Sequence, residues 1–571
     1  MSGVQKSTSK YERLCNLSHK ALGLVLKRYH NRDEATNTGV GAIMRIARLT
    51  VVLVAALMFV HPALGQRALT PKIPTLPVIG PATAPISPQS CQPASSGVDA
   101  PYDCSGAITS AFNKLGSAGG TVSFAPGIYY VTVQCSASDA PDSQAVAINL
   151  PSGVRLYSPL PGRATIKLVN KPCTYSCTAS RGQVAGQGTG LHYDAIIGGA
   201  GNNLVIDGLV IDAGVPKQPT NDDLLFVRNF AQGTYKIPMT CPNTGNRYGV
   251  RIYTGDAIEI INSTFRHFVT PNILQINGCV SDVTVENNIF EETGFVGVPS
   301  PTFNYDTSAI SIDGEAIAVV RNILQPYMPP DPTASQPQMV TFGARTAIEV
   351  HGSDVTVTGN GVRGYENGIL PVGEVPNPTN PVGAARQLIK NNAIAGAYEG
   401  IAIWNCDNTE PDPGLMQDVA ITENAISISP NAWNGLVDGA DPTFGVGIER
   451  LNGGCSILGL TIAKNFIAFA PGVLPSMQKG GSGDAGVFLS GSKVSTTQIG
   501  NVLIAQNFVG GAPSDGAVNW PQGILATVNP AVNFSSDPTC KDNRLEGAAA
   551  ACPSPANNAG SRKMKRNAAP F

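Results

Sequence analysis

Short runs of aliphatic residues that alternate with polar ones recur along the middle and the C-terminal part of the chain. Many of these runs end in one phrase, Asp-Val-x-Val/Ile-x-x-Asn, which is found at 282–288, 354–360 and 418–424, with looser copies ending at Asn262, Asn322, Asn392, Asn465 and Asn507. An apolar–polar alternation of period two predicts half-buried strands. Self-similarity at an interval of tens of residues predicts a solenoid, in which each repeat stacks on the next.

A second strand precedes most of these phrases. It has the form Gly/Ala-Ile/Val-x-Ile, as in Ala347–Val350 and Gly400–Ile403. Each coil is therefore predicted to run strand, turn, strand, Asn turn, strand, loop. We expect the Asn to adopt the left-handed backbone conformation at a sharp turn, and its amide to bond to the equivalent amides above and below. The alternative is a β-sandwich with Asn-rich turns, which would not require registered copies.

A short helix is predicted just before the first repeats. Its apolar positions are Ile108, Ala111, Phe112 and Leu115, Ser105 is its expected N-cap, and Gly116 is expected to end it. An alternating strand follows in the sequence Gly-Gly-Thr-Val-Ser-Phe-Ala-Pro-Gly-Ile-Tyr at 119–129. This combination resembles the N-terminal cap of pectate-lyase-like proteins. The resemblance implies an all-β fold, a single-stranded right-handed parallel β-helix with a capping α-helix, over roughly residues 99–545.

Four regions are expected along the chain. Residues 1–65 form an N-terminal extension and a secretory signal, because Arg45 and Arg48 precede an apolar run at 49–60 and a small-residue cleavage site at 63–65. Met44 is then a plausible start and Gln66 the mature N-terminus. Residues 66–98 are a Pro-rich linker, 99–545 the β-helix, and 546–571 a disordered basic tail. This predicts a secreted, periplasmic or cell-surface protein with no stable membrane span after signal cleavage.

Composition restricts the partners. Charged residues make up 14% of the chain and the formal net charge is −2, so no basic surface for nucleic acid is indicated. An oxidising compartment favours disulfides, and the local pairs would be Cys91/Cys104, Cys173/Cys177, Cys241/Cys279, Cys406/Cys455 and Cys540/Cys552, although spacing alone leaves the connectivity open. No metal site or cofactor is predicted. The oxygen-rich loop 407–412 could supply calcium ligands, but a polar surface loop is favoured because its spacing fits no calcium-loop motif.

Candidate chemistry follows from the face that each strand position occupies. In the resembled polysaccharide-active proteins the substrate lies on the outer face of the first strand of each coil. Here the x residue of Gly-Ile-x-Ile and the residue after the second aliphatic point outward. The x positions are Arg251, Gln275, Ser311, Glu349, Ala402, Glu449, Phe488 and Leu525, and the next outward positions are Tyr253, Asn277, Asp313, His351, Trp404, Leu451, Ser490 and Thr527.

These positions suggest roles. Asp313, Glu349 and His351 are the predicted catalytic residues, because two carboxyls on neighbouring coils suit glycoside hydrolysis and a base near a uronate suits elimination or epimerisation. The predicted substrate-binding residues are Arg251 as the cation that offsets the uronate, Tyr253 as a further base or contact, Trp404 as a stacking platform, and Glu449. A purely solvated outer face is the alternative to this assignment.

The sequence therefore predicts an exported carbohydrate-active protein, a polysaccharide lyase, hydrolase or epimerase that binds an extended glycan and is monomeric. The signatures of individual families do not decide between these activities, since of the polygalacturonase motifs only Asp222-Asp223 is present. A non-catalytic cell-surface or matrix protein that binds glycans remains open, as does a trimeric phage-tail-like spike.

Overall fold

The computed structural model describes residues 69–96, 98, 100–132, 145–169, 194–214, 247–268, 273–293, 295–296, 308–326, 341–342, 345–373, 384–405, 415–429, 443–451, 456–469, 485–490, 498–510, 522–526, 532, 534–545 and 552. The predicted signal peptide, the loop 407–412 and the basic tail beyond Cys552 lie outside these residues. Among the described residues, no helix is long and apolar enough to cross a membrane.

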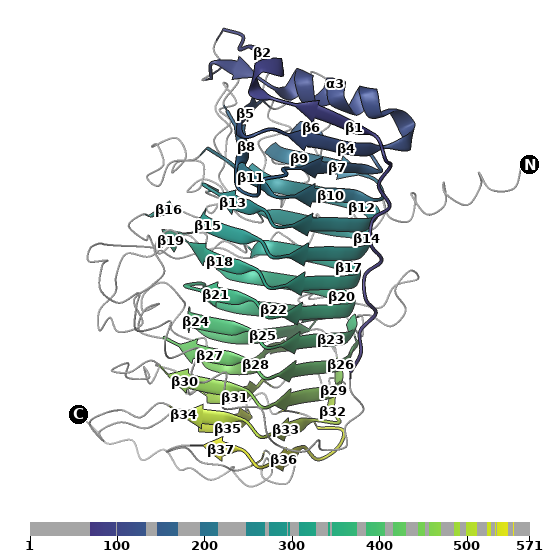
Figure 1. Ribbon diagram of the computed structural model, residues 1–571. Helices are drawn as coiled ribbons and strands as arrows, with labels where there is room; N and C mark the ends of the chain where they lie inside the picture. The colour runs from purple at the N-terminus through teal and green to yellow at the C-terminus, as the bar shows by residue number, and fades with distance from the viewer. Residues whose placement is uncertain are drawn as a thin grey trace, which may run out of the picture.

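The chain is a right-handed parallel β-helix, as predicted (Figure 1). Its first and second strands form one 21-stranded sheet and its third strands a 12-stranded sheet. In the middle coils the first two strands are continuous: β12 (Arg247–Ile261), β14 (Leu274–Glu286), β17 (Ser308–Val320) and β20 (Thr346–Thr358). In the later coils they are separate: β22 (Asn367–Gly373) and β23 (Ala384–Lys390), β25 (Glu399–Asn405) and β26 (Leu415–Thr422), β28 (Phe444–Leu451) and β29 (Ser456–Ala463), β31 (Ala485–Leu489) with β32 (Ile499–Gly500) and β33 (Leu503–Ala505), and β35 (Gln522–Ala526) with β36 (Thr539–Lys541).

The N-terminal coils contribute shorter strands to the same sheet: β1 (Thr83–Ile86), β4 (Gly120–Phe124), β6 (Ala145–Asn149), β7 (Val154–Tyr157), β9 (Asp194–Ala200) and β10 (Leu204–Asp207). The third strands are β5 (Gly127–Val131), β8 (Ala164–Leu168), β11 (Leu209–Asp212), β13 (Thr264–Arg266), β15 (Ile289–Thr293), β18 (Ile323–Pro326), β21 (Gly361–Arg363), β24 (Ala393–Ala397), β27 (Ala425–Ile428), β30 (Phe466–Phe469), β34 (Phe508–Gly510) and β37 (Arg544–Leu545). Two small antiparallel pairs lie outside the stack: β2 (Gln92–Pro93) with β3 (Tyr102–Asp103), and β16 (Phe295–Val296) with β19 (Thr341–Phe342).

Alternate residues of each strand fill a narrow interior. Ile310, Ile348 and Ile369 are stacked in register on β17, β20 and β22, and all three are fully buried. Aromatic side chains stack in the same way on the third strands, where the rings of Phe265 and Phe290 lie 4.9 Å apart and nearly parallel. A coil spacing of about 4.8 Å lets each side chain contact its counterpart on both sides, so the core is continuous along the stack.

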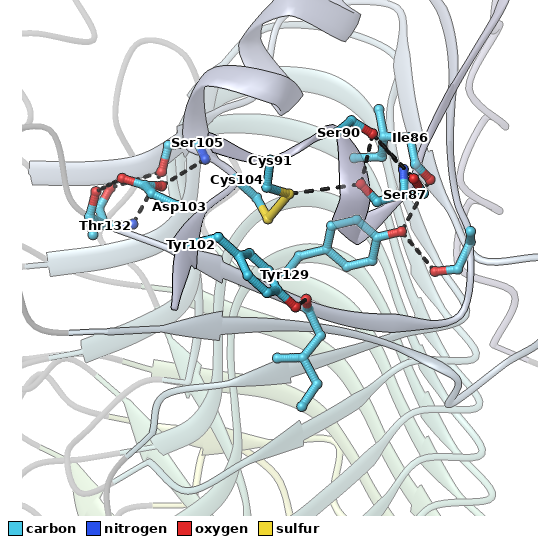
Figure 2. Close-up of a disulfide and its surroundings, with 12 residues drawn as sticks. Ile86, Ser87, Ser90, Cys91, Tyr102, Asp103, Cys104, Ser105, Tyr129 and Thr132 are labelled. Atoms are coloured by element: carbon cyan, nitrogen blue, oxygen red, sulfur yellow. Dashed lines mark hydrogen bonds between the residues drawn. A yellow bond between two sulfur atoms is a disulfide. The ribbon is translucent and has the colours of Figure 1, made fainter. Parts of the chain in front are cut away.

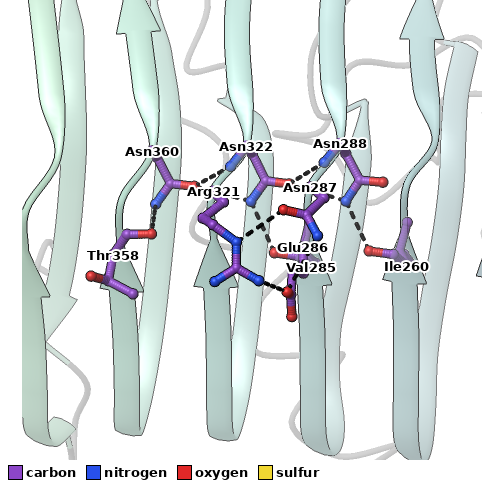
Figure 3. Close-up of polar contacts among 9 residues, drawn as sticks. All are labelled: Ile260, Val285, Glu286, Asn287, Asn288, Arg321, Asn322, Thr358 and Asn360. Atoms are coloured by element: carbon purple, nitrogen blue, oxygen red, sulfur yellow. Dashed lines mark hydrogen bonds and ion pairs between the residues drawn. The ribbon is translucent and has the colours of Figure 1, made fainter. Parts of the chain in front are cut away.

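The repeated Asn residues form a hydrogen-bonded ladder (Figure 3). Asn322 Oδ1 accepts from both the backbone N–H and Nδ2 of Asn288, at 3.0 Å each, and Asn322 Nδ2 donates to Asn360 Oδ1 at 3.0 Å. The same pattern runs through Asn288, Asn322, Asn360, Asn392, Asn424, Asn465, Asn507 and Asn543. The predicted stacking of amides is confirmed.

Two details of the Asn prediction are wrong. The left-handed residue is the one before each ladder Asn, such as Asn287 (φ 56°) before Asn288 or Arg321 (φ 53°) before Asn322. Asn262 is such a preceding residue (φ 53°), and Ser263 occupies the ladder position, where its backbone N–H donates to Asn288 Oδ1. The ladder Asn is thus selected for its hydrogen bonds rather than for its backbone conformation.

The capping helix α3 (Ser105–Leu115) covers the N-terminal end of the stack (Figure 1). Its N-cap is Cys104, so Ser105 is the first helical residue rather than the cap, and Gly116 ends the helix at φ 62° as expected. The Ser105 backbone N–H instead donates to Asp103 Oδ1 (Figure 2). Short 3-10 turns flank the cap at Pro88–Ser90 and Gly116–Ala118. The Gly pair of the cap motif is required because a Cβ on Gly119 would lie 2.2 Å from the Gly153 carbonyl oxygen.

Two of the expected disulfides are present. Cys91–Cys104 ties the segment before the cap to the helix N-terminus (Figure 2), and Cys540–Cys552 closes the C-terminal end. The other three expected pairs fall wholly or partly outside the described residues. Because both observed disulfides lie at the ends of the stack, they secure the coils that have a neighbour on one side only.

A strap precedes β1. Residues 69–82 run along the outside of the stack towards the cap, opposite to the direction in which the coils accumulate (Figure 1). Three backbone N–H groups of the strap donate to side-chain oxygens of left-handed residues at the first turn of alternate coils: Lys72 to Asp354, Thr75 to Asp282 and Val78 to Asn203, at 2.8–2.9 Å. The segment placed in the Pro-rich linker is thereby attached to the coils along this edge.

Candidate functional site

Three of the predicted site residues are brought together on the outer face of β17 and β20. Asp313 pairs in register with His351, and Ser311 pairs with Glu349. The inward residues between them, Ile312 and Val350, are fully buried, so the outward orientation follows from strand alternation. The constellation Asp313, Glu349 and His351 therefore occupies two neighbouring coils, as the sequence predicted.

Glu349 and His351 form a hydrogen-bonded dyad. His351 Nε2 lies 2.8 Å from Glu349 Oε1, with 26% of the His351 side chain and 16% of the Glu349 side chain exposed. Burial alone would raise the pKa of Glu349, but the His351 ring, the Ser308 hydroxyl and the Arg345 guanidinium outweigh it and hold this pKa below its ordinary value. Glu349 is thus an anion that orients the imidazole, and it is not suited to donate a proton.

Ser308 and Arg345 belong to the site although the sequence did not indicate them. The Ser308 hydroxyl, on β17, donates to Glu349 Oε2. Arg345 precedes β20, is 9% exposed, and has its Nε 3.7 Å from a Glu366 carboxylate oxygen. Neither residue belongs to the Gly-Ile-x-Ile pattern, since Ser308 is the first residue of β17 and Arg345 immediately precedes β20. The buried guanidinium of Arg345 beside Glu349 is therefore visible in the fold but not in the strand pattern of the sequence.

The predicted binding residues are more dispersed. Arg251 is 9% exposed on β12 and pairs in register with Gln275 of β14, in the outward column that continues to Ser311 and Glu349. Trp404 is 3% exposed, and the Arg345 guanidinium lies 5.8 Å from its ring centroid. Trp404 is therefore packed within the protein rather than presented as an open platform. The side chain of Tyr253 lies outside the described residues.

One coil was missed and one register was wrong. β22 lies between β20 and β25 and places Leu370 and Val372 opposite Glu349 and His351. Trp404 is consequently two coils from His351. On β28 the residue in register with Ala402 is Gly447 rather than Glu449, and Glu449 lies at an irregularity between the pairs Ile403–Ile448 and Trp404–Arg450. Glu449 is therefore not in the outward column, and its side chain lies outside the described residues.

On the coils that follow the dyad in the chain, the same outer face is apolar. Here we define the outer apolar cluster as Leu370, Val372, Ala402, Trp404, Phe444, Ala485 and Phe488, which pack together separately from the interior core. Every member is buried, and the rings of Phe444 and Phe488 stack 5.4 Å apart. The outer face thus changes from polar to apolar between β20 and β22.

A second ionic cluster lies on the third strands, away from this face. Asp212 on β11 accepts from His267 Nδ1 at 2.9 Å and from Arg266 Nε at 3.1 Å, and His267 Nε2 lies 2.8 Å from Glu292 on β15. The hydrogen bond to Asp212 raises the pKa of His267, although burial opposes it. The pKa of Asp212 is lowered in spite of its burial, chiefly by His267. This cluster joins three successive coils through side-chain contacts.

Among the described residues, no group of His, Cys, Asp and Glu side chains has the arrangement of a metal site. The loop 407–412, which was considered for calcium, lies outside them. The side chains that the structure brings together here are an anionic carboxylate, an imidazole, a second carboxyl and a buried guanidinium.

Comparison with known proteins gives likenesses of fold. No protein-family model and no curated protein sequence matches the chain. Among solved structures it is similar to the tailspike protein of Escherichia coli bacteriophage HK620 in complex with a pentasaccharide, at 17% identity and a TM-score of 0.46, over 80% of this chain and 64% of the tailspike. It is also similar to a hyperthermoactive exopolygalacturonase from Thermotoga maritima, at 10% identity and a TM-score of 0.42, over 84% of this chain and 94% of that one.

The chain thus spans less than two thirds of the tailspike's length. Because both TM-scores are below 0.5, the fold is established by the strand pairing of this chain rather than by these likenesses.

Proposed function

We propose that the protein is an exported carbohydrate-active β-helix protein that acts on an anionic polysaccharide by abstracting a proton from a uronate residue. The observation that carries the proposal is the Glu349–His351 dyad on the outer face, 2.8 Å between the two polar atoms. An imidazole held by an anionic carboxylate is a well-oriented general base. Both side chains remain partly exposed, which a substrate requires.

The chemistry can be written for the residues present. Glu349 accepts from His351 Nε2–H, which makes Nδ1 the basic atom. Nδ1 removes the C5 proton of the uronate, the C4–C5 double bond forms and the bond from C4 to the glycosidic oxygen breaks. The imidazolium then returns the proton to the leaving oxygen. Arg345, about nine-tenths buried and close enough to Glu349 to lower its pKa, offsets the negative charge that develops on the uronate carboxylate. Arg251 lies three coils from Glu349 in the same column, about 14 Å along the stack, so its charge would act on a sugar further along the chain.

Two related activities use the same groups. Return of the proton to the opposite face of C5 would be epimerisation, without bond cleavage. Hydrolysis would use Asp313 and Glu349 as its two carboxyls, and the lowered pKa of Glu349 suits it to act as the nucleophile or base. If the outer face only binds glycans, the protein is a non-catalytic surface or matrix component.

The test is a panel of polyuronates and neutral polysaccharides incubated with the mature protein. Absorbance near 235 nm reports the unsaturated product of elimination, reducing ends without this absorbance report hydrolysis, and exchange of solvent deuterium into C5 reports epimerisation. We expect elimination, reduced at least about 100-fold in His351→Gln and Glu349→Gln. The matched control is His267→Gln, a carboxylate-paired histidine outside the site, which should retain activity. Full activity in Asp313→Ala, Glu349→Ala and His351→Gln would contradict the site assignment.

A further inference from the structure

The outward column of the first strands changes from polar to apolar residues at β22. From β12 to β20 the residues in register are Arg251, Gln275, Ser311 and Glu349, and from β22 to β31 they are Leu370, Ala402, Gly447 and Phe488. Within this column Arg251, Gln275 and Ser311 are also largely buried, at 8–9% exposed, and Leu370 is fully buried. The Glu349 and His351 side chains, at 16% and 26% exposed, are the most accessible described part of this face next to the boundary.

The outer apolar cluster closes this end of the face. Its members are buried and stacked across β22, β25, β28 and β31, as the Phe444–Phe488 pair shows. A polysaccharide that lay along the polar column would meet Leu370 and Val372 one coil after Glu349 and His351. To continue, it would have to separate a packed apolar layer and place hydroxyl groups against it, which burial of polar groups opposes. The outer apolar cluster therefore bounds the polar column at β22.

Two buried carbonyl oxygens near the dyad have no hydrogen-bond partner among the described residues. They are Oε1 of Gln275, which is 8% exposed, and Oδ1 of Asn367, which is 2% exposed. Gln275 lies two coils from Glu349 in the same column, a distance of about 10 Å along the stack. Asn367 begins β22, on the closed side of the dyad, in register with Thr346. A buried acceptor without a donor is unfavourable, and a sugar hydroxyl is a donor of the right kind.

We infer that the outer face of β14 to β20 binds the end of a glycan chain, with the terminal sugar over the Glu349–His351 dyad, next to the outer apolar cluster, and with Gln275 accepting a hydroxyl group of a sugar further from the end. The inference rests on the proposed function for the identity of the ligand as a glycan. One coil step is close to the length of one pyranose residue. The dyad therefore faces a bond one or two residues from the chain end, and the product is a mono- or disaccharide.

The decisive measurement compares two preparations of one polyuronate at equal mass concentration, one of long chains and one of short chains. An end-acting protein turns over in proportion to the number of chain ends, so the short-chain preparation reacts faster. With the long-chain preparation, the viscosity of the solution falls only slowly for each bond broken. Equal rates per mass with an early loss of viscosity would overturn the inference while leaving the proposed function intact. Absence of turnover on every polymer would contradict the proposed function instead. In that case calorimetric affinity for the same two preparations decides, because end binding follows the number of ends and mid-chain binding follows total length.

A variant tests the hydroxyl contact. Gln275→Leu removes the acceptor at nearly constant volume, and we expect KM to rise about ten-fold with the thermal midpoint unchanged or raised. The matched control is Ser429→Ala, since Ser429 is also a buried side chain with an unpartnered oxygen among the described residues but follows the third strand β27, away from the first-strand face. An unchanged KM in Gln275→Leu, or an equal rise in both variants, would overturn the assigned contact.

Discussion

The Asn ladder allows a quantitative prediction for Asn322→Ala (Figure 3). The change removes two hydrogen bonds accepted by Asn322 Oδ1, from the backbone N–H and Nδ2 of Asn288, and two donated by Nδ2, to Val285 O and Asn360 Oδ1. Asn288 Nδ2 keeps its bond to Ile260 O, but the Asn288 backbone N–H loses its acceptor in a fully buried position. An orphaned buried donor costs about 1–3 kcal/mol, and each of the other lost bonds somewhat less. We therefore expect a loss of about 3 kcal/mol.

The assay is urea unfolding of the intact chain, followed together with amide hydrogen exchange at Asn288 and Ile323. The matched control is Asn543→Ala at the last rung, where Asn543 is partly exposed and water can replace the amide for Asn507. We expect that control to lose about 1 kcal/mol. The reasoning is refuted if Asn322→Ala is no more destabilising than Asn543→Ala, or if protection of the Asn288 amide is unchanged.

Two further predictions concern polar side chains outside the interior core, His267 and Asp282. His267 has a raised pKa, so its contribution to stability is complete below its ordinary value of about 6.5 and is lost as the pH rises through the higher folded-state value. His267→Gln should abolish this loss in thermal melts between pH 6 and 9, and an identical pH profile would contradict it. Asp282→Ala should cost about 1–2 kcal/mol, because alanine in a left-handed position is strained and the bond from Thr75 is lost, whereas Asp282→Asn should stay within about 0.5 kcal/mol. Equal stability of the two variants in chemical unfolding would refute this.

The sequence was most informative where side-chain chemistry repeats. A ladder Asn bonds to the next coil through its own amide, so the position is visible in the chain, and it led to Asp313, Glu349 and His351 on the adjoining strands. The predicted ladder position was wrong where the neighbouring residue could occupy it instead. At Asn262-Ser263 the polar pair is ambiguous by one residue, and only the structure shows that Ser263 takes the ladder position.

The missed parts of the site have a different cause. β22 reads Asn-Gly-Ile-Leu-Pro-Val-Gly, in which a proline replaces the second aliphatic, so its strand did not stand out. At β28 the glycines at 445 and 447 allow two alignments, and the wrong one placed Glu449 outward. Arg345 lies immediately before β20, outside the alternation of the strand, and only the structure shows that its guanidinium acts on Glu349. Residues outside the strands are not specified by strand patterns.

The spacing of the strap's three hydrogen bonds constrains the number of coils beneath it. Its three attachment points are three residues apart, each follows a proline at 71, 74 or 77, and they bind every second coil, at β10, β14 and β20. Three residues of an extended proline-rich chain cover about 9 Å, and two coil steps cover about 9.6 Å. The length of three strap residues and the rise of two coils are therefore nearly equal. Insertion or removal of one coil beneath the strap would put its donors opposite the wrong turns, whereas a change of two coils with three strap residues would preserve the match, so this solenoid can lengthen there in pairs of coils.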